Sequence, residues 1–135
     1  MSVIPVLSSI APLAETSDLW FVDIWGVMHN GVRPFASSVA ACAAFRERGG
    51  TALLVTNSPR PSESVAKQLD GIGVSRESYD GIVSSGDVSR SLIEQWAGRR
   101  VLLIGLERDK ATFAGLSAQP GASVDDAEVV VCTNL

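Results

Sequence analysis

Short, continuously apolar segments alternate with amphipathic segments along this chain, and this alternation restricts the fold more than any other feature. Five apolar runs occupy residues 19–24, 51–55, 81–83, 101–104 and 129–132. Apolar side chains at helical spacing predict helices at residues 37–48, 61–69 and 84–96, and a shorter helix at residues 107–115. Short buried strands that alternate with helices are typical of a parallel sheet with helices on both faces. We therefore predict a three-layer α/β fold.

Glycine and proline residues mark where the predicted helices begin and end. Gly49 and Gly50 follow the first helix, and Pro61 lies in the first turn of the second. Asp87 lies in the first turn of the third helix, where we expect its charge to interact with the positive end of the helix dipole. A chain of 135 residues is long enough for one hydrophobic core, so we predict that residues 1–135 form a single domain.

The composition describes a globular, mildly acidic protein. Hydrophobic residues make up 46% of the chain and charged residues 19%, and the formal net charge is -4. No basic surface is expected that would attract nucleic acid or anionic lipid, and no apolar run approaches the roughly 20 residues that span a bilayer. The apolar N-terminal stretch is interrupted by Pro5 and Pro12 and has no basic segment, so we do not interpret it as a signal peptide. We expect a cytoplasmic protein in which Cys42 and Cys132 are buried, reduced thiols.

Polar residues that follow the first two strands indicate phosphoryl chemistry. Asp23 ends the first apolar run, and Thr56 and Asn57 follow the second. Ligands of parallel sheets bind beyond the carboxyl ends of the strands, where these side chains would meet. A carboxylate can attack phosphorus, a hydroxyl and a backbone N–H can hold phosphoryl oxygens, and Mg²⁺ offsets the negative charge of both reactants. We therefore expect a small phosphorylated substrate.

Two motifs give this sequence its resemblance to a known family. Residues 21–31 read FVDIWGVMHNG and residues 54–61 read LVTNSPRP, and a looser similarity continues through IVSSGD at residues 82–87. With these motifs the chain resembles the haloacid dehalogenase-like (HAD-like) hydrolases, and within them the class IIA branch of nitrophenylphosphatase-like and pyridoxal-phosphatase-like enzymes. The resemblance implies a Rossmann-like core. It also implies a Mg²⁺-dependent phosphatase that acts on a small phosphorylated metabolite through an aspartyl-phosphate intermediate.

The resemblance assigns roles to four residues. Asp23 would be the nucleophile and a Mg²⁺ ligand, and the backbone carbonyl of Trp25 would be a second Mg²⁺ ligand. Thr56 and Asn57 would hold the phosphate. Phosphatases of this family usually carry a second aspartate at the position of Trp25, and that aspartate protonates the leaving group. An indole does not titrate, so the sequence predicts a phosphatase without this acid. His29 is either a substitute acid or a solvated loop residue.

The resemblance covers only part of such a hydrolase. A lysine motif and a second acidic motif of the family normally follow a large cap domain, which is inserted after the strand that corresponds to residues 129–132. We therefore expect the N-terminal portion of the fold, without the cap domain and the C-terminal half. This expectation supports an alternative function, a non-catalytic or truncated HAD-like fragment that binds phosphate or self-associates through open apolar faces.

Two other functions of α/β folds fit the sequence less well. A dinucleotide-binding domain needs the pattern G-x-G-x-x-G after its first strand, and Gly26 and Gly31 do not supply it. A phosphoacceptor domain of the receiver type needs a pair of acidic residues after its first strand, whereas Ile24, Trp25 and Gly26 follow here. Both alternatives are therefore less consistent with the chain than a hydrolase of the HAD-like type.

Overall fold

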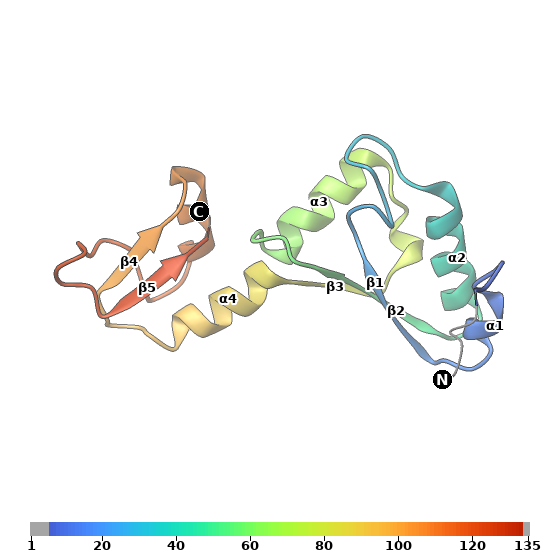
Figure 1. Cartoon of the computed structure of the whole chain (residues 1–135), viewed down its shortest axis with the longest axis horizontal. Coiled ribbons are helices and arrows are strands. Elements are labelled where there is room, and N and C mark those ends of the chain that lie inside the picture. Colours follow the sequence, from blue (N-terminus) through green and yellow to red (C-terminus); the bar gives the residue numbers. More distant parts are fainter. Residues whose placement is uncertain (1–5, 134–135) are drawn as a thin grey trace. The chain divides into compact units, whose positions relative to one another are not determined.

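A computed structural model describes residues 6–133 of the chain, so residues 1–5 of the apolar N-terminal stretch lie outside the described part. The elements are drawn in Figure 1. In chain order they are α1 (Ala11–Ala14), β1 (Leu19–Asp23), α2 (Ala36–Glu47), β2 (Thr51–Thr56), α3 (Ser62–Ile72), the 3-10 helix η1 (Arg76–Ser78), β3 (Gly81–Ser84), α4 (Ser85–Glu94), β4 (Val101–Ile104), the 3-10 helix η2 (Glu107–Phe113) and β5 (Val129–Cys132).

The predicted α/β, Rossmann-like architecture is confirmed. All five predicted strands form at the expected positions, and the three longer helices form within a few residues of their predicted bounds. The helix expected at residues 107–115 is instead a 3-10 helix, η2, whose side chains pack against a small sheet. Neither α1 nor η1 was predicted, because each is too short to show a helical period.

The described strands form two sheets, one with the order β1-β2-β3 and one with the order β4-β5. β1 pairs in parallel with β2, and β4 pairs in parallel with β5. The chain divides into two compact units, Met1–Thr56 with Ala66–Ile82, and Asn57–Val65 with Val83–Leu135. The assignment of residues 1–135 to a single domain therefore stays a prediction.

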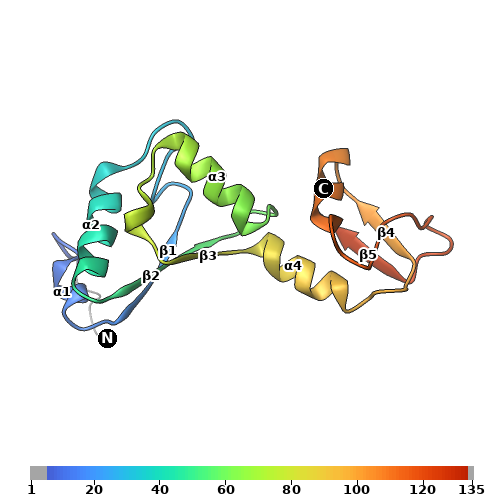
Figure 2. The ribbon, with the colours of Figure 1, turned by 180° about the vertical axis from the view of Figure 1, so that it is seen from behind.

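Helices cover one face of the sheet in the first unit. Figure 1 shows α2 and the later turns of α3 on the same side of the strands, and Figure 2 shows this arrangement from behind. On this face the Trp20 ring of β1 stacks on the Phe45 ring of α2, with 4.0 Å between the ring centroids and 4° between the planes. Ala52 and Leu54 of β2 and Leu69 of α3 are fully buried here. These contacts form the core beneath β1 and β2.

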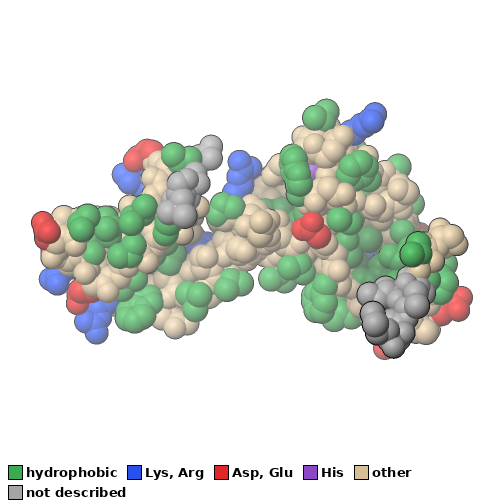
Figure 3. Space-filling view, in the orientation of Figure 1, with side chains coloured by type: hydrophobic (Ala, Val, Ile, Leu, Met, Phe, Trp, Pro, Cys, Tyr) green, Lys and Arg blue, Asp and Glu red, His purple; other side chains and the backbone are tan. Residues whose placement is uncertain are grey.

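The opposite face of this sheet is apolar and exposed. Successive side chains of a strand point to opposite faces, and the alternate residues Leu19, Phe21 and Val55 are all exposed, Phe21 to 69%. Phe21 is paired in register with the half-buried Leu53 of β2. In Figure 3, hydrophobic side chains gather where Figure 1 draws these strands. We call Leu19, Phe21, Leu53 and Val55 the open sheet face.

The second unit has its own small core. Ile93 of α4, Val101 of β4, Phe113 of η2 and Ala118 are all buried against one another. The Arg90 guanidinium donates hydrogen bonds to backbone carbonyls at the end of η2, which fastens α4 to η2. The apolar side chains of β4 and β5 that face this cluster complete the core.

Two further expectations can be compared with the structure. Among residues 6–133, no helix is both long enough and apolar enough to cross a membrane. Neither cysteine forms a disulfide, and Cys42 is buried as predicted. Cys132, however, is exposed, so the expectation that both thiols are buried is wrong for this residue. It belongs to the exposed set of alternate residues on β5, which apolar strand composition alone does not identify.

Candidate active site

The structure places Asp23 and Thr56 at the same end of two neighbouring strands. Asp23 is the last residue of β1, and Thr56 is the last residue of β2. The strands are parallel, and Asp23 is paired in register with Val55, the residue before Thr56. Asn57 follows Thr56 directly and begins the loop that leads to α3. The carboxylate and the hydroxyl therefore end adjacent strands on one edge of the sheet, as ligand-binding residues of parallel sheets do.

The Asp23 carboxylate is exposed to solvent, and it makes no hydrogen bond or ion pair with the residues that the structure describes. Some other acidic side chains do have protein partners, such as Asp80, which accepts hydrogen bonds from Arg46 and from the Ala52 amide at 2.8 Å each. A carboxylate without such partners keeps its lone pairs available for a metal ion or for attack on an electrophile.

In the turn after β1, the Ile24 carbonyl accepts hydrogen bonds, whereas the Trp25 carbonyl has no donor among the described residues. The Ile24 carbonyl accepts hydrogen bonds from the amides of Val27 and Met28, at 3.3 and 2.9 Å, and the Gly26 amide donates to the His29 carbonyl at 2.9 Å. Among the described residues, no donor is recorded for the Trp25 carbonyl. The turn thus uses the groups on either side of this carbonyl and leaves its oxygen available.

The Trp25 side chain lies over the loop that follows the turn. Its indole is 64% exposed and meets the His29 ring edge to face, with 5.4 Å between the centroids and 87° between the planes. Gly31 lies beneath the indole with φ of 89°, and a Cβ at this position would lie 2.7 Å from an indole carbon. A side chain at residue 31 would therefore be strained by its backbone conformation and would also collide with the indole.

His29 is a structural residue of this loop. It is only 3% exposed, and its Nδ1 accepts a hydrogen bond from the Gly31 amide at 2.8 Å. The alternative that His29 is a solvated loop residue is therefore wrong, because the loop folds back over the ring. Burial lowers the pKa of His29 below its usual value, which favours the neutral imidazole and disfavours a role as a proton donor.

The loop between β2 and α3 is held by the beginning of α4. The Ser58 carbonyl accepts a hydrogen bond from the Gly86 amide at 3.0 Å. The Asp87 carboxylate accepts from the Ser62 amide, with 3.1 Å to each of its oxygens. Sequence reasoning placed Asp87 at the start of its own helix and missed this contact with α3. Pro61 was an available signal, because a proline before a helix has no side-chain acceptor to cap it.

The residues after β1 fit a divalent cation. Among the described residues no group of three or more His, Cys, Asp or Glu side chains could hold a metal ion. Mg²⁺, however, keeps several waters and needs only one or two carboxylates beside its substrate. The Asp23 carboxylate, which has no partner among the described residues, and the Trp25 carbonyl are hard oxygen donors of the kind it prefers.

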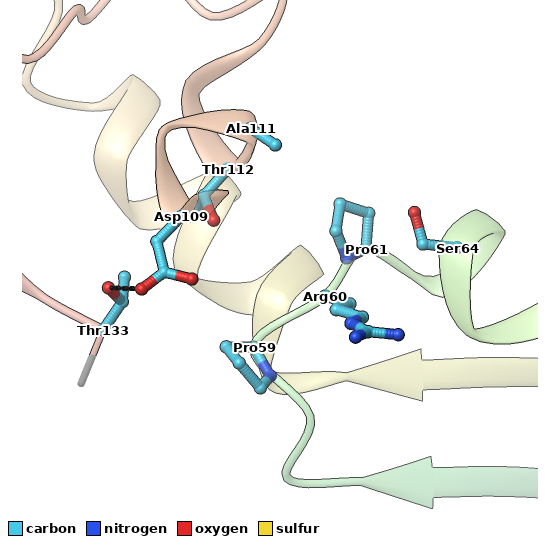
Figure 4. Close-up of a pocket in the computed structure, with 8 residues that line it drawn as sticks. All are labelled: Pro59, Arg60, Pro61, Ser64, Asp109, Ala111, Thr112 and Thr133. Atoms are coloured by element: carbon cyan, nitrogen blue, oxygen red, sulfur yellow. Dashed lines mark hydrogen bonds between the residues drawn. The ribbon is translucent and has the colours of Figure 1, made fainter. Parts of the chain in front are cut away.

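A pocket in the second unit does not include the predicted site residues. Figure 4 shows Asp109 and Thr133, whose side chains are joined by a hydrogen bond of 2.8 Å, together with residues of the loop before α3. The lining residues are Pro59, Arg60, Pro61, Ser64, Asp109, Ala111, Thr112 and Thr133. Arg60, which belongs to the second motif at residues 54–61, lies in this lining.

Comparison with known proteins identifies relatives of this chain. Residues 20–119 match the family described as haloacid dehalogenase-like hydrolase. The structure is similar to that of a haloacid dehalogenase-like hydrolase from Brucella suis 1330, with 41% sequence identity and a TM-score of 0.85 over 97% of this chain and 49% of that chain. The comparison with curated proteins gave no match.

Two solved phosphatases are similar in structure at lower sequence identity. A glycerol phosphate phosphatase from Mycobacterium tuberculosis, in complex with magnesium, has 26% identity and a TM-score of 0.65, over 88% of this chain and 36% of that chain. A 4-nitrophenylphosphatase from Thermotoga maritima has 19% identity and a TM-score of 0.66, over 89% of this chain and 46% of that chain, and shows a shared fold. This chain therefore spans about half the length of these proteins or less.

Proposed function

Because this chain belongs to the haloacid dehalogenase-like hydrolases, we propose that it is a Mg²⁺-dependent phosphatase that hydrolyses a small phosphorylated metabolite through an aspartyl-phosphate on Asp23. The observation that carries this proposal is the exposed Asp23 carboxylate, which has no partner among the described residues and ends β1 beside the carboxyl end of β2. The similarity to a glycerol phosphate phosphatase supports phosphate esters as the substrate class.

In the first half of the proposed reaction, an Asp23 oxygen forms a bond to phosphorus. The bond between phosphorus and the ester oxygen breaks, and its electron pair leaves with that oxygen. The Trp25 indole does not titrate, so in this scheme the leaving oxygen takes its proton from water. In the second half, a water oxygen bonds to phosphorus and releases a proton, and the Asp23 carboxylate leaves with the electron pair of the acyl phosphate bond.

The remaining residues of the proposed site bind and orient the phosphate. The Thr56 hydroxyl and the Asn57 backbone N–H would donate hydrogen bonds to phosphoryl oxygens, both in the bound substrate and in the transition state. Asp23 and the Trp25 carbonyl would hold the divalent cation, and the magnesium complex of the related glycerol phosphate phosphatase supports this choice of metal. When bound, such a cation offsets the repulsion between the carboxylate and the dianionic phosphate.

Hydrolysis of p-nitrophenyl phosphate by the purified chain tests this proposal. We expect turnover that requires Mg²⁺ and is lost on chelation. Asp23→Asn removes the nucleophile and should abolish turnover. Asp18→Asn is a matched control, because Asp18 is an exposed acid just before the opposite end of the same strand, and it should leave turnover unchanged. Metal-independent turnover, or turnover that survives Asp23→Asn, would contradict the proposal.

The open sheet face favours a second candidate function, that of a phosphate-binding HAD-like chain that self-associates. Leu19, Phe21 and Val55 expose contiguous apolar surface on adjacent strands. Sedimentation over a range of concentrations should then show association that Phe21→Lys weakens. Val32→Lys is the control, because Val32 is 82% exposed but lies in the loop after β1. A monomer at all concentrations, with Mg²⁺-dependent turnover, would exclude this candidate.

A further inference from the structure

We infer that Asp87 is a positioning residue for the proposed reaction. Its carboxylate, together with the backbone of Gly86, holds the loop at residues 57–61 in the conformation in which Asn57 meets the phosphate. The inference rests on the proposed function, because it concerns the loop that this function assigns to phosphate binding. Asp87 itself does not contact the reacting atoms, and it acts through the loop.

The first observation is that α3 has no cap of its own. The first N–H groups of a helix have no partner within the helix, and a side-chain acceptor at the preceding residue usually satisfies one of them. That residue is Pro61, whose side chain has no acceptor. Asp87 supplies the missing acceptor from α4, with both carboxylate oxygens 3.1 Å from the Ser62 amide. Its negative charge also suits the positive end of the α3 dipole.

The second observation is a close approach between two backbone segments. The Gly86 amide donates to the Ser58 carbonyl at 3.0 Å, one residue beyond Asn57. A Cβ on Gly86 would lie 2.5 Å from the carbonyl carbon and oxygen of Arg60. Real Cβ atoms do not approach a backbone this closely, so only glycine fits here without displacing the loop. The loop is thus held at Ser58 and at Ser62.

The third observation is that α4 does not need the Asp87 carboxylate for itself. Its own N-terminus is capped by Ser84, whose Oγ accepts from the Asp87 amide at 3.1 Å. Ser84 is 1% exposed, so this cap is protected from solvent. The Asp87 carboxylate is therefore directed to α3, and its loss should release the loop while α4 stays capped.

Release of the loop would affect phosphate binding more than the chemical step. A loop that is already ordered binds its ligand without the further entropy loss of becoming ordered. Thr56 and Asn57 would contact the phosphate both in the bound substrate and in the transition state, so a disordered loop weakens both states alike. An interaction of this kind changes KM and leaves kcat almost unchanged.

The test compares Asp87→Ala, Asp87→Asn and Asp125→Ala in the p-nitrophenyl phosphate assay with Mg²⁺. We expect Asp87→Ala to raise KM about tenfold. A lost helix cap changes the free energy by an amount that corresponds to about this factor in a binding constant. Asp87→Asn should recover most of this loss, because an amide oxygen still accepts the Ser62 N–H. Asp125 is an exposed acid of the same unit, and its replacement should leave KM unchanged.

The outcomes separate this inference from the function on which it rests. A wild-type chain that turns over substrate, with the same KM in Asp87→Ala, would overturn the positioning role alone. A lower kcat with unchanged KM would also overturn it, because that pattern reports a loss of folded protein or of an interaction made only in the transition state, and neither is a loss of phosphate binding. A well-folded wild-type chain without turnover would instead overturn the proposed function and, with it, this inference.

Discussion

The loop after β1 offers a quantitative test of how Trp25 and Gly31 depend on each other. Gly31→Ala adds a Cβ at a residue with φ of 89°, 2.7 Å from an indole carbon. A left-handed conformation costs an alanine about 1–2 kcal/mol, and part of this is offset because alanine lowers the entropy of the unfolded chain by about 0.4–1 kcal/mol. The backbone contribution is therefore about 1 kcal/mol.

The collision with the indole adds a second contribution. Overpacking in a rigid core costs about 1–3 kcal/mol, but the indole is 64% exposed and can move aside. Moving it loses the edge-to-face contact with His29, which is worth about 0.5–1.5 kcal/mol. We therefore expect Gly31→Ala to lower the free energy of unfolding by about 2 kcal/mol in total, roughly half from the backbone and half from the indole.

A double-mutant cycle separates the two contributions. Urea denaturation would be measured for Gly31→Ala, Trp25→Ala and the double variant. In the Trp25→Ala background the cost of Gly31→Ala should fall to about 1 kcal/mol, which gives a coupling of about 1 kcal/mol. Gly49→Ala is the matched control, because its φ is 90° and no atom lies within 4 Å of the added Cβ. Additive costs in the cycle would refute the proposed contact.

Three further predictions concern stability and catalysis. Because burial lowers the pKa of His29, the imidazole binds a proton more readily in the unfolded chain, and the free energy of unfolding should fall as the pH is lowered from 7.5 to 5.5. Urea denaturation of His29→Gln should show a smaller fall over this range. An equal fall in the variant would contradict the assignment of this pH dependence to His29. Because Trp25 cannot protonate a leaving group, kcat should be at least about 100-fold lower for an alkyl phosphate than for p-nitrophenyl phosphate. Trp25→Asp should reduce this difference in kcat between the two substrates. Equal kcat values for the two substrates in the wild-type chain would indicate that another residue acts as the acid. Phe45→Ala removes a ring that is 3% exposed and stacked on Trp20, and should lower the free energy of unfolding by about 3–5 kcal/mol; a loss below about 1 kcal/mol would show that the ring is not part of the core.

Local sequence patterns predicted the elements of the fold well, because short apolar strands are easily distinguished from the amphipathic helices between them. β4 and β5 have the same bounds as the predicted apolar runs, and β2 extends its predicted run by one residue, Thr56. The family resemblance is confirmed over residues 20–119. The pairing of strands into two sheets was not predictable, since it depends on contacts between segments far apart in the chain.

The candidate site could be predicted only where it depends on local features of the sequence. Strand ends are local features, so Asp23 and Thr56 could be placed at one edge of the sheet from sequence alone. Their catalytic roles stay predictions. The burial of His29 and the contact of Asp87 with Ser62 arise where the chain folds back on itself or where two helices meet. Neither feature produces a periodic pattern in the sequence. Only Pro61, which has no side-chain acceptor, indicated that α3 is capped by a residue of another element.

The proposed function requires that Asp23 carries the phosphoryl group during turnover. The most direct measurement is mass spectrometry of the chain after rapid acid quenching during hydrolysis of p-nitrophenyl phosphate with Mg²⁺. We expect a fraction of molecules with one added phosphoryl group, located in the peptide that contains Asp23, and no such fraction in Asp23→Asn. A phosphoryl group at another residue, or turnover without any phosphorylated chain under conditions that accumulate the intermediate, would contradict the proposed function.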